Sequence, residues 1–303
     1  MLPSASIPSP SLNDVHLGPF TVHVYGVMYV LAVLAAIVIT RRRWRAEGED
    51  PDLVYEVALW GFPAGLIGGR IYFLITSWDQ APHTWWGPFA VWDGGLGIWG
   101  GILAGTLAGM WVLRRRGADV PRFLDAAAPA LLVAQSIGRV GNYFNQELFG
   151  RPTTLPWALR ISPAHRPDGY GAYATFHPTF LYEILWNLSL AAALVWLGHH
   201  RRVHPGGLFA LYVAGYSLFR IFEELLRVDP AHHILGLRLN FFVAACCARA
   251  GSRCSRGCSA ARFARWRRAS TTGSSGGRVR STVARIGRSR RASIPRWVTR
   301  GPS

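Results

Sequence analysis

The sequence predicts an all-α, polytopic membrane protein with six transmembrane helices, a truncated seventh, and a loop region on the outer, periplasmic side between the fourth and fifth. Two observations lead to this prediction. Of the 303 residues, 50% are hydrophobic and only 16% are charged, whereas about a quarter of the residues in soluble proteins are charged. The apolar residues also gather into stretches near the roughly 20 residues that a helix needs to cross a bilayer.

The predicted spans follow one another along most of the chain. They fall at Phe20–Thr40, Leu53–Thr76, Leu96–Leu113, Phe123–Ile137, Phe180–Leu197 and Gly207–Leu225. The first is expected to remain as an anchoring helix, because residues 1–19 carry no arginine and so lack the charged start of a cleaved signal peptide. A seventh span begins at Asn240, but its apolar residues end at Ala248, too early to cross.

The arginines between the spans indicate the orientation. Clusters follow the first, third and fifth spans, at Arg41, Arg42, Arg43 and Arg45, at Arg114, Arg115 and Arg116, and at Arg201 and Arg202. Cytoplasmic loops carry such an excess of positive charge. We therefore expect the amino terminus and the long loop from Asn142 to Phe176 to face outward, and loops of that length are more often functional than idle.

The net charge of +17 comes from the carboxyl-terminal tail. All 33 basic residues are arginine, 15 of them lie between Arg249 and Arg300, and no acid follows Asp229, which leaves 18 arginines against 16 acids elsewhere. The body of the protein therefore has no excess charge that would need a nucleic-acid partner.

Three segments are expected: a short outer segment (1–19), a transmembrane domain (20–243) and a tail rich in Arg, Ser and Gly (244–303). The tail is predicted to be disordered because it has few large aliphatic residues and no acids. A shifted reading frame would give the same composition, and binding to anionic headgroups is the functional alternative. Its cysteines, at 246, 247, 254 and 258, fit no zinc spacing, so we expect no metal and no cofactor.

Small residues are dense in the second and third spans. Glycines occur at positions 61, 65, 68 and 69 and again at positions 94, 95, 97, 100, 101, 105 and 109. Small residues at four-residue spacing let helix backbones approach closely in lipid. We interpret these glycines first as helix-packing positions.

Ionisable side chains at membrane depth are the most informative feature, because they are costly there and usually functional. The first group is the segment Gly138–Gly150, in which Arg139 is flanked by two glycines that allow irregular backbone and is followed by Asn142, Asn145 and Glu147. The alternative is an interfacial arginine that reaches the headgroups. A lone arginine of that kind does not need two asparagines and a glutamate behind it.

A second group lies in the sixth span, where Tyr216, Arg220 and Glu224 are four residues apart, followed by Arg227 and Asp229. In a helix the first three share one face, so Glu224 is expected to pair with Arg220. Such a pair either locks two helices together or holds the guanidinium toward a phosphate, which its planar fork suits.

The third group opens the fifth span, at His177, Thr179, Tyr182 and Glu183. Thr179 is expected to cap the helix, with Tyr182 and Glu183 in its first turn, so helix initiation explains much of this group. At the start of the first span, His23 and Tyr25 are expected to lie at the same membrane face, where a tyrosine is more often an interfacial residue than a catalytic one.

Together these segments resemble the prolipoprotein diacylglyceryl transferases, a family of bacterial inner-membrane enzymes. Gly138–Gly150 is similar to the family's GRxGNxxNxExxG block. Three other parts of the sequence also resemble the family and occur in the same order as in the family. They are His23–Gly26, His177–Glu183 and the group in the sixth span that contains Tyr216, Arg220, Glu224 and Arg227. The resemblance covers residues 16 to about 243.

The resemblance implies the first step of lipoprotein maturation. A diacylglyceryl group would pass from phosphatidylglycerol to the lipobox cysteine thiol of a prolipoprotein, forming a thioether and releasing glycerol 1-phosphate. It also implies a multi-pass protein of the bacterial cytoplasmic membrane, whose partners are phosphatidylglycerol, prolipoprotein signal peptides and membrane lipid, with no cofactor.

The residues to which we assign roles follow from these groups and the resemblance. The expected catalytic residues are Arg139, Arg220, Glu147, Tyr25 and His177, and the expected substrate-binding residues are Arg139, Asn142, Asn145, Gly150, Tyr216 and Glu224. Arg139 and Arg220 would stabilise charge on the departing phosphate, with Asn142 and Glu147 orienting the first and Glu224 the second. The base stays open between Tyr25, Glu147 and His177, because two nearby arginines would already favour the thiolate.

Two departures from the family pattern leave other functions open. Trp99 stands where many members carry histidine, and Phe180 stands where many carry glutamine. Trp99 and the shortened seventh span favour, as the alternative, a lipid-binding protein or inactive homologue. A transporter is a further alternative, since broken, glycine-rich helices with buried arginines also occur there, but the two halves show no internal repeat.

Overall fold

The computed structural model describes residues 6–10, 14–17, 20–82, 84–90, 95–201, 203–228, 233–234 and 237–238. The chain divides into two compact units, Met1–Ala261 and Arg262–Ser303, and all described residues belong to the first. The predicted tail, the short seventh span, Arg202 and Asp229 lie outside the described residues.

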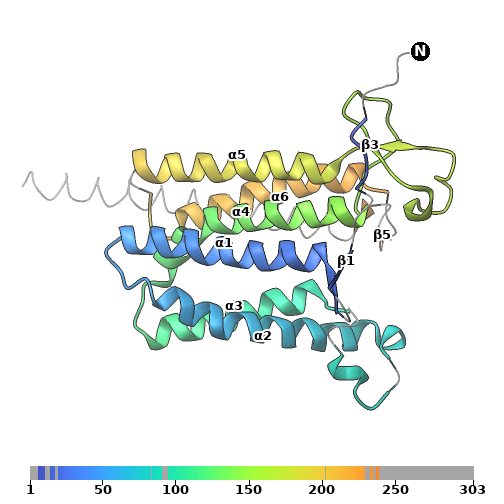
Figure 1. Ribbon diagram of the computed structural model, residues 1–303. Helices are drawn as coiled ribbons and strands as arrows, with labels where there is room; N and C mark the ends of the chain where they lie inside the picture. The colour runs from blue at the N-terminus through green and yellow to red at the C-terminus, as the bar shows by residue number, and fades with distance from the viewer. Residues whose placement is uncertain are drawn as a thin grey trace, which may run out of the picture. The chain divides into compact units, whose positions relative to one another are not determined.

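The described part of the chain is mostly helical (Figure 1). Its α-helices are α1 (Val24–Ala46), α2 (Leu53–Thr76), α3 (Ile98–Arg115), α4 (Val120–Asn145), α5 (Thr179–His200) and α6 (Gly207–Leu226). Short antiparallel pairs join β1 (Asp14–Leu17) to β2 (Phe20–His23), β3 (Leu159–Arg160) to β4 (Thr175–Phe176) and β5 (His233–Ile234) to β6 (Leu237–Arg238). Single 3-10 turns occur at Trp78–Gln80, Gly87–Phe89 and Pro163–His165.

Each predicted span corresponds to one helix, but the bounds of two spans were wrong. Residues 20–23 form strand β2, and α1 begins only at Val24 and continues to Ala46, so the first arginine cluster lies on the helix itself. Helix α4 runs on past the predicted end at Ile137 to Asn145. The expected irregular backbone around Gly138 and Gly141 is therefore helical, and the long loop starts four residues later than predicted.

Helices α1, α2, α4 and α5 are long and apolar enough to cross a membrane. Helix α3 has only 18 residues and ends in two arginines, and α6 carries Arg220, Glu223 and Glu224. Large hydrophobic side chains such as Leu59 (69% exposed) and Ile75 (77% exposed) cover the outer faces of the helices. This pattern is typical of helices whose solvent is lipid.

Helices α2 and α3 pack through their glycines, which confirms the packing interpretation. A Cβ atom added at Gly105 would lie 3.1 Å from the carbonyl oxygen of Gly61, and one added at Gly65 would lie 3.4 Å from that of Gly101. At the end of this contact the amide of Gly97 donates to the carbonyl of Gly69 at 2.8 Å. Larger side chains would force the two backbones apart.

Helix α4 packs against α1, α5 and α6. Toward the α4 amino terminus, Trp44 and Phe123 meet edge to face within a cluster that also includes Val54 and Leu113. Further along, Leu132 of α4 is buried among Leu194 of α5 and Leu208 of α6. Helices α1, α5 and α6, which carry the other ionisable groups, therefore surround the carboxyl-terminal half of α4.

Candidate active site

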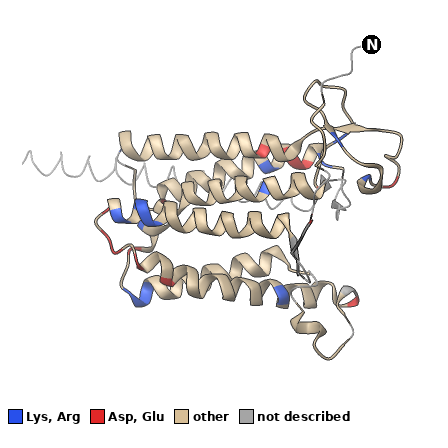
Figure 2. Cartoon of the chain, viewed as in Figure 1, with Lys and Arg blue, Asp and Glu red and all other residues tan. Residues whose placement is uncertain are grey.

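Arg139 of α4 and Glu183 of α5 form a buried ion pair. Nε of Arg139 lies 2.7 Å from Oε2 of Glu183, whose side chain is fully buried, while 17% of the Arg139 side chain is exposed. In Figure 2 the acidic and basic positions of α4, α5 and α6 lie close together within the helical body. An uncompensated charge at this place would be strongly unfavourable, so each group depends on the other.

Arg220 of α6 is surrounded by three carboxylates. Its two terminal nitrogens bond to Glu223 and Glu224, and Nη1 lies 3.6 Å from Oε2 of Glu183. The predicted Arg220–Glu224 pair is confirmed. The phenol of Tyr216, one turn earlier on α6, donates to Oε1 of Glu183 at 3.3 Å. Glu183 is therefore the group that joins both arginines and Tyr216.

A hydrogen-bonded chain extends from Arg139 to the membrane face. Nη1 of Arg139 donates to Oδ1 of Asn142 at 3.1 Å, and Nδ2 of Asn142 donates to Oε1 of Glu147 at 2.6 Å. Asn142 is buried, whereas Glu147 is exposed. Asn142 is thus in direct contact with Arg139, and Glu147 reaches Arg139 through Asn142.

The cluster is balanced in charge but not saturated with hydrogen bonds. Arg139, Arg220 and Arg227 face Glu183, Glu223 and Glu224, with Arg227 Nη1 3.6 Å from Glu224. A guanidinium has five N–H donors; Nη1 of Arg139 donates to Asn142, and Nε lies at ion-pair distance from Glu183. No oxygen of a described residue bonds to its Nη2. One edge of the Arg139 fork is therefore available to an anion.

Tyr25, near the start of α1, lies over the backbone of α4 beside this chain. A Cβ atom added at Gly141 would lie 2.6 Å from Cδ2 of the Tyr25 ring. Gly141 is thus required by a close approach between α1 and α4 rather than by irregular backbone. The structure brings Tyr25 to the same end of the helices as Arg139, as expected. His23, two residues earlier, contacts Asp14, with Nδ1 2.5 Å from Oδ1.

His177 belongs to a separate set of contacts before α5. Its Nδ1 lies 3.1 Å from the phenol oxygen of Tyr182, to which the indole of Trp157 donates at 3.0 Å. Partial burial lowers the pKa of the His177 imidazole from its ordinary value of 6.5. Its carbonyl accepts from the amide of Gly150 at 2.9 Å. Within the described part of the chain, His177 forms no hydrogen bond or ion pair with Arg139 or Arg220.

The predicted cap of α5 was wrong. Pro178 occupies the N-cap position, Thr179 is the first helical residue, and no acid lies in the first turn, so Glu183 is in the second. The hydroxyl of Thr179 donates instead to the carbonyl of Leu148, because the loop after α4 folds back against this helix start. Glu183 is thereby free of a capping role and points to the two arginines.

Asn145 and Gly150 lie apart from the two arginines. Asn145 lines a cavity of about 300 Å³ with Gln146, Glu147, Leu148, Phe149, His165, Pro167 and Val228. Gly150 is enclosed by packing, since an added Cβ atom would lie 2.8 Å from that of His177 and 3.2 Å from the carbonyl oxygen of Leu226. Glu147 lines this cavity and also accepts a hydrogen bond from Asn142, so it links the cavity to the hydrogen-bonded series Arg139–Asn142–Glu147.

Sequence reasoning missed two members of the cluster, Glu183 and Glu223. Glu183 was attributed to helix initiation and Glu223 was not considered, although it stands three residues after Arg220, a spacing at which helical side chains meet. Trp99 is the second residue of α3 and is 42% exposed. Among the described residues, no group of three His, Cys, Asp or Glu side chains could hold a metal ion.

Two arginines buried among glutamates in a helical membrane protein mark a candidate functional site. Residues 13–253 match the family model described as prolipoprotein diacylglyceryl transferase. The chain therefore belongs to the prolipoprotein diacylglyceryl transferase family, and the family predicted from the motifs is confirmed.

Three curated bacterial relatives are each 48% identical to this chain. The match to phosphatidylglycerol–prolipoprotein diacylglyceryl transferase of Frankia alni covers 80% of this chain and 64% of the relative. The relative numbered 2 from Streptomyces coelicolor matches over 78% of this chain and 75% of its own length. The match to the phosphatidylglycerol–prolipoprotein diacylglyceryl transferase of Cutibacterium acnes covers 78% of this chain and 80% of the relative. The chain thus spans a little under two thirds of the Frankia relative and more of the other two.

Proposed function

We propose that this chain transfers a diacylglyceryl group from phosphatidylglycerol to the lipobox cysteine thiol of a prolipoprotein, in the bacterial cytoplasmic membrane. Family membership supports the reaction, and the names of the relatives support the two substrates. The observation that carries the proposal is the open Nη2 edge of Arg139, beside a buried and balanced cluster of charges.

The reaction replaces a carbon–oxygen bond by a carbon–sulfur bond. The thiol sulfur attacks the glyceryl carbon of the lipid, and the electron pair of the broken bond leaves with the phosphate of glycerol 1-phosphate. Negative charge therefore grows on the phosphate oxygens. Arg139 would donate from Nη2 to one of these oxygens, while Glu183 lies beside Nε and Asn142 accepts from Nη1. Donors fixed in advance stabilise such charge most effectively in a water-poor site.

Arg220 would have a different role from that of Arg139. Its terminal nitrogens are held by Glu223 and Glu224, so it offers less of its fork to a ligand. Its positive charge near Glu183 keeps that carboxylate from opposing a bound phosphate. The thiol proton would pass to a base or to the departing phosphate, and Tyr25, Glu147 and His177 stay the candidates for a base.

We further propose six membrane spans with the amino terminus outside, so that the Arg139 end of the helices faces outward. The arginine clusters that lie on and after α1, α3 and α5 support this orientation. The site would then lie near the outer surface, where a secreted prolipoprotein presents its lipobox. The cavity beside Asn145 and Glu147 is a suitable place for the peptide.

The test is transfer of label. Purified full-length protein is incubated with phosphatidylglycerol labelled in an acyl chain and with a lipobox peptide, and label on the cysteine is measured. The proposal predicts label on the peptide, and a loss of about 10²–10³-fold in rate for Arg139→Ala, the usual effect of removing one such donor. Normal turnover in Arg139→Ala would remove the assigned role of Arg139.

The alternative of a lipid-binding protein without catalytic activity gives a different result. Phosphatidylglycerol would bind, and an Arg139→Ala variant would bind it less, but no label would reach the cysteine. Trp99 favours this alternative modestly. It lies on α3, which packs mainly on α2, and not on the helices that carry the arginines.

A further inference from the structure

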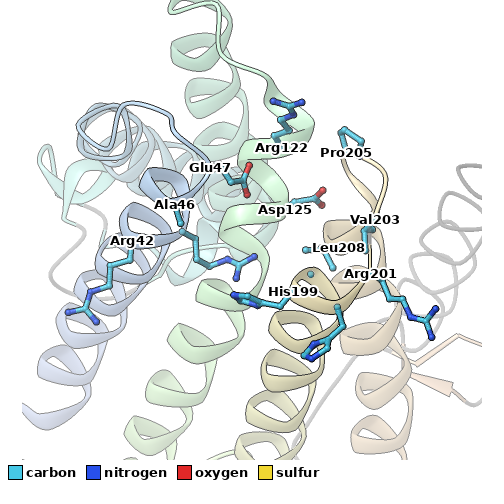
Figure 3. Close-up of a pocket in the computed structure, with 13 residues that line it drawn as sticks. Arg42, Ala46, Glu47, Arg122, Asp125, His199, Arg201, Val203, Pro205 and Leu208 are labelled. Carbon is cyan, nitrogen blue, oxygen red and sulfur yellow. The ribbon is translucent and has the colours of Figure 1, made fainter.

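A second cavity, of about 860 Å³, lies at the other end of the helices (Figure 3). Its walls come from the ends of α1 and α5, the starts of α4 and α6, and the connection between α5 and α6. The lining includes Arg42, Arg43, Glu47, Arg122, Asp125, Gly198, His199, His200, Arg201 and Leu208. A cavity of this size accommodates a ligand of several tens of atoms.

This cavity is far from the candidate active site. Arg122 and Arg139 are 17 residues apart on the same helix, and at 1.5 Å per residue this places them about 25 Å apart along α4. The hydrocarbon core of a bilayer is about 30 Å thick. The two sites therefore lie toward opposite membrane faces, and one lipid molecule cannot occupy both.

Arginines dominate the charge of the cavity. Four of them, Arg42, Arg43, Arg122 and Arg201, face only two acids, Glu47 and Asp125. In Figure 3, Arg42 and Arg201 lie at opposite flanks, one on α1 and one after α5. Neither of these two arginines forms an ion pair with a described residue. Their guanidinium groups point outward from the two flanks (Figure 3), so the four arginines against two acids leave an excess of positive charge around the mouth of the cavity.

The one buried acid is already occupied by backbone donors. Oδ2 of Asp125 accepts from the amide of Gly206 at 2.7 Å, and Oδ1 accepts from that of Phe209 at 2.8 Å. Asp125 therefore holds the start of α6, and Arg43 is fixed by donating from Nε to the carbonyl of Ala126 at 3.1 Å. A cation would meet four arginines here, so the expected ligand is an anion.

The wall formed by α5 leaves room for a ligand beside Arg43. A Cβ atom added at Gly198 would lie 4.0 Å from Nη2 of Arg43 and 3.2 Å from Cδ1 of Leu208. Because Gly198 has no side chain, the guanidinium stays accessible between α1 and α5. Trp196 of α5, 57% exposed, and Val38 of α1, 44% exposed, belong to the exposed apolar surface of two helices whose ends wall the cavity. A headgroup in the cavity could keep its acyl chains against this surface.

We propose that the cavity binds the phosphate-bearing headgroup of an anionic phospholipid from the cytoplasmic leaflet, as a site distinct from the one that contains Arg139. Arginine forks match phosphate oxygens in geometry. The apolar surface and the position at a membrane face favour a lipid over a soluble phosphate ester, although both would offer the same phosphate to the arginines. The bound lipid would join the ends of α1, α4 and α5.

The experiment counts lipids on the full-length protein in detergent by native mass spectrometry, with phosphatidylserine as the probe and phosphatidylcholine as the neutral comparison. The test variant is Arg42→Gln/Arg201→Gln. The matched control is Arg45→Gln/Arg114→Gln, which removes the same charge from exposed positions at the same end that do not line the cavity.

The proposal predicts that phosphatidylserine binds in preference to phosphatidylcholine, and that its affinity falls roughly tenfold or more in the test variant, because each substitution removes a charge-assisted hydrogen bond to the phosphate. The control should change affinity by less than about threefold. Equal losses in both variants would mean general attraction by surface charge and would overturn the proposal, as would no loss in either.

Two further measurements keep the result unambiguous. Ala46→Trp fills the cavity without changing charge, and it should also weaken phosphatidylserine binding, even if the double arginine variant folds poorly. Inorganic phosphate or glycerol phosphate at millimolar concentration tests the soluble source. If these ions bind and no phosphatidylserine does, the lipid assignment is overturned.

Discussion

Glu183 is the residue on which the candidate site depends most. It is fully buried, lies 2.7 Å from Arg139 and 3.6 Å from Arg220, and accepts from Tyr216. Buried ion pairs add little net stability compared with apolar replacements, but removal of one partner leaves an uncompensated charge. The role of Glu183 is thus to fix where the two guanidinium groups lie.

We predict that Glu183→Gln is both less stable and less active. Loss of one partner of a buried pair typically costs about 3–5 kcal/mol, and Arg139 would lose its fixed orientation, so label transfer should fall at least tenfold. Thermal unfolding in detergent and the transfer assay measure the two effects. The control is Glu56→Gln, which removes a partner of the exposed Arg116 and should change neither. A fully active Glu183→Gln would contradict the role given to this residue.

The pH dependence tests whether His177 takes part. Partial burial lowers its pKa below 6.5, so the folded protein keeps the imidazole neutral at pH values where the unfolded chain already binds a proton. Stability from this group is therefore lost as the pH falls below 6.5. If neutral His177 is the base, the rate of transfer should fall with acid at a midpoint below 6.5, and His177→Ala should lack that fall. An unchanged acid limb in His177→Ala would exclude it as the base.

Some residues of the site follow from sequence and others do not. The pairing of Arg220 with Glu224 follows from four-residue spacing in one helix, and Asn142 and Glu147 stand close to Arg139 in the chain. Glu183 lies on a different helix from both arginines, so its contacts depend on how α4, α5 and α6 pack. Local spacing carries no such information, and for that reason its place near a helix start was misread.

At the scale of the elements, the helices could be predicted but their ends could not. Hydropathy located all six helices, because a continuous apolar stretch is a strong signal. The end of α4 was missed because Gly138 and Gly141 lower helix propensity, and the prediction gave this local effect more weight than packing. Gly141 is helical since Tyr25 of α1 covers it, and that contact is again between helices.

This contact gives a matched pair of substitutions within one motif. Gly141→Ala would place a methyl group 2.6 Å from the Tyr25 ring, whereas no described atom lies within 4 Å of a methyl group at Gly138. We predict that Gly141→Ala destabilises the protein by about 1–3 kcal/mol, and that Gly138→Ala leaves stability unchanged or raises it by about 0.5–1 kcal/mol. Thermal unfolding of both variants is the measurement. Equal effects would show that α1 and α4 do not approach as described.

At the scale of the whole molecule, the account needs the two ends of the helical body to face opposite sides of the membrane. The outward end would carry Arg139, Glu147 and the loop between α4 and α5, and the inward end would carry the arginine clusters and the second cavity. The proposed arrangement would expose the candidate active site to secreted substrates and the second cavity to the cytoplasmic leaflet.

Fusions to alkaline phosphatase, which is active only outside the cytoplasm, test this arrangement. A fusion after Asp168, between α4 and α5, should be active, and one after Gly117, between α3 and α4, should be inactive. The positive-inside pattern of the arginine clusters is the physical reason. The reverse result would place Arg139 at the cytoplasmic face and would remove access to secreted prolipoproteins.

The central claim is that the open edge of Arg139 binds the phosphate of the lipid that reacts. The most direct measurement is a structure of the full-length protein in nanodiscs that contain phosphatidylglycerol. The account predicts a phosphate oxygen about 2.7–2.9 Å from Nη2 of Arg139, with Glu183 and Asn142 still bonded to the other nitrogens. Lipid phosphate found away from both Arg139 and Arg220, with the two guanidinium groups bonded only to protein, would contradict it.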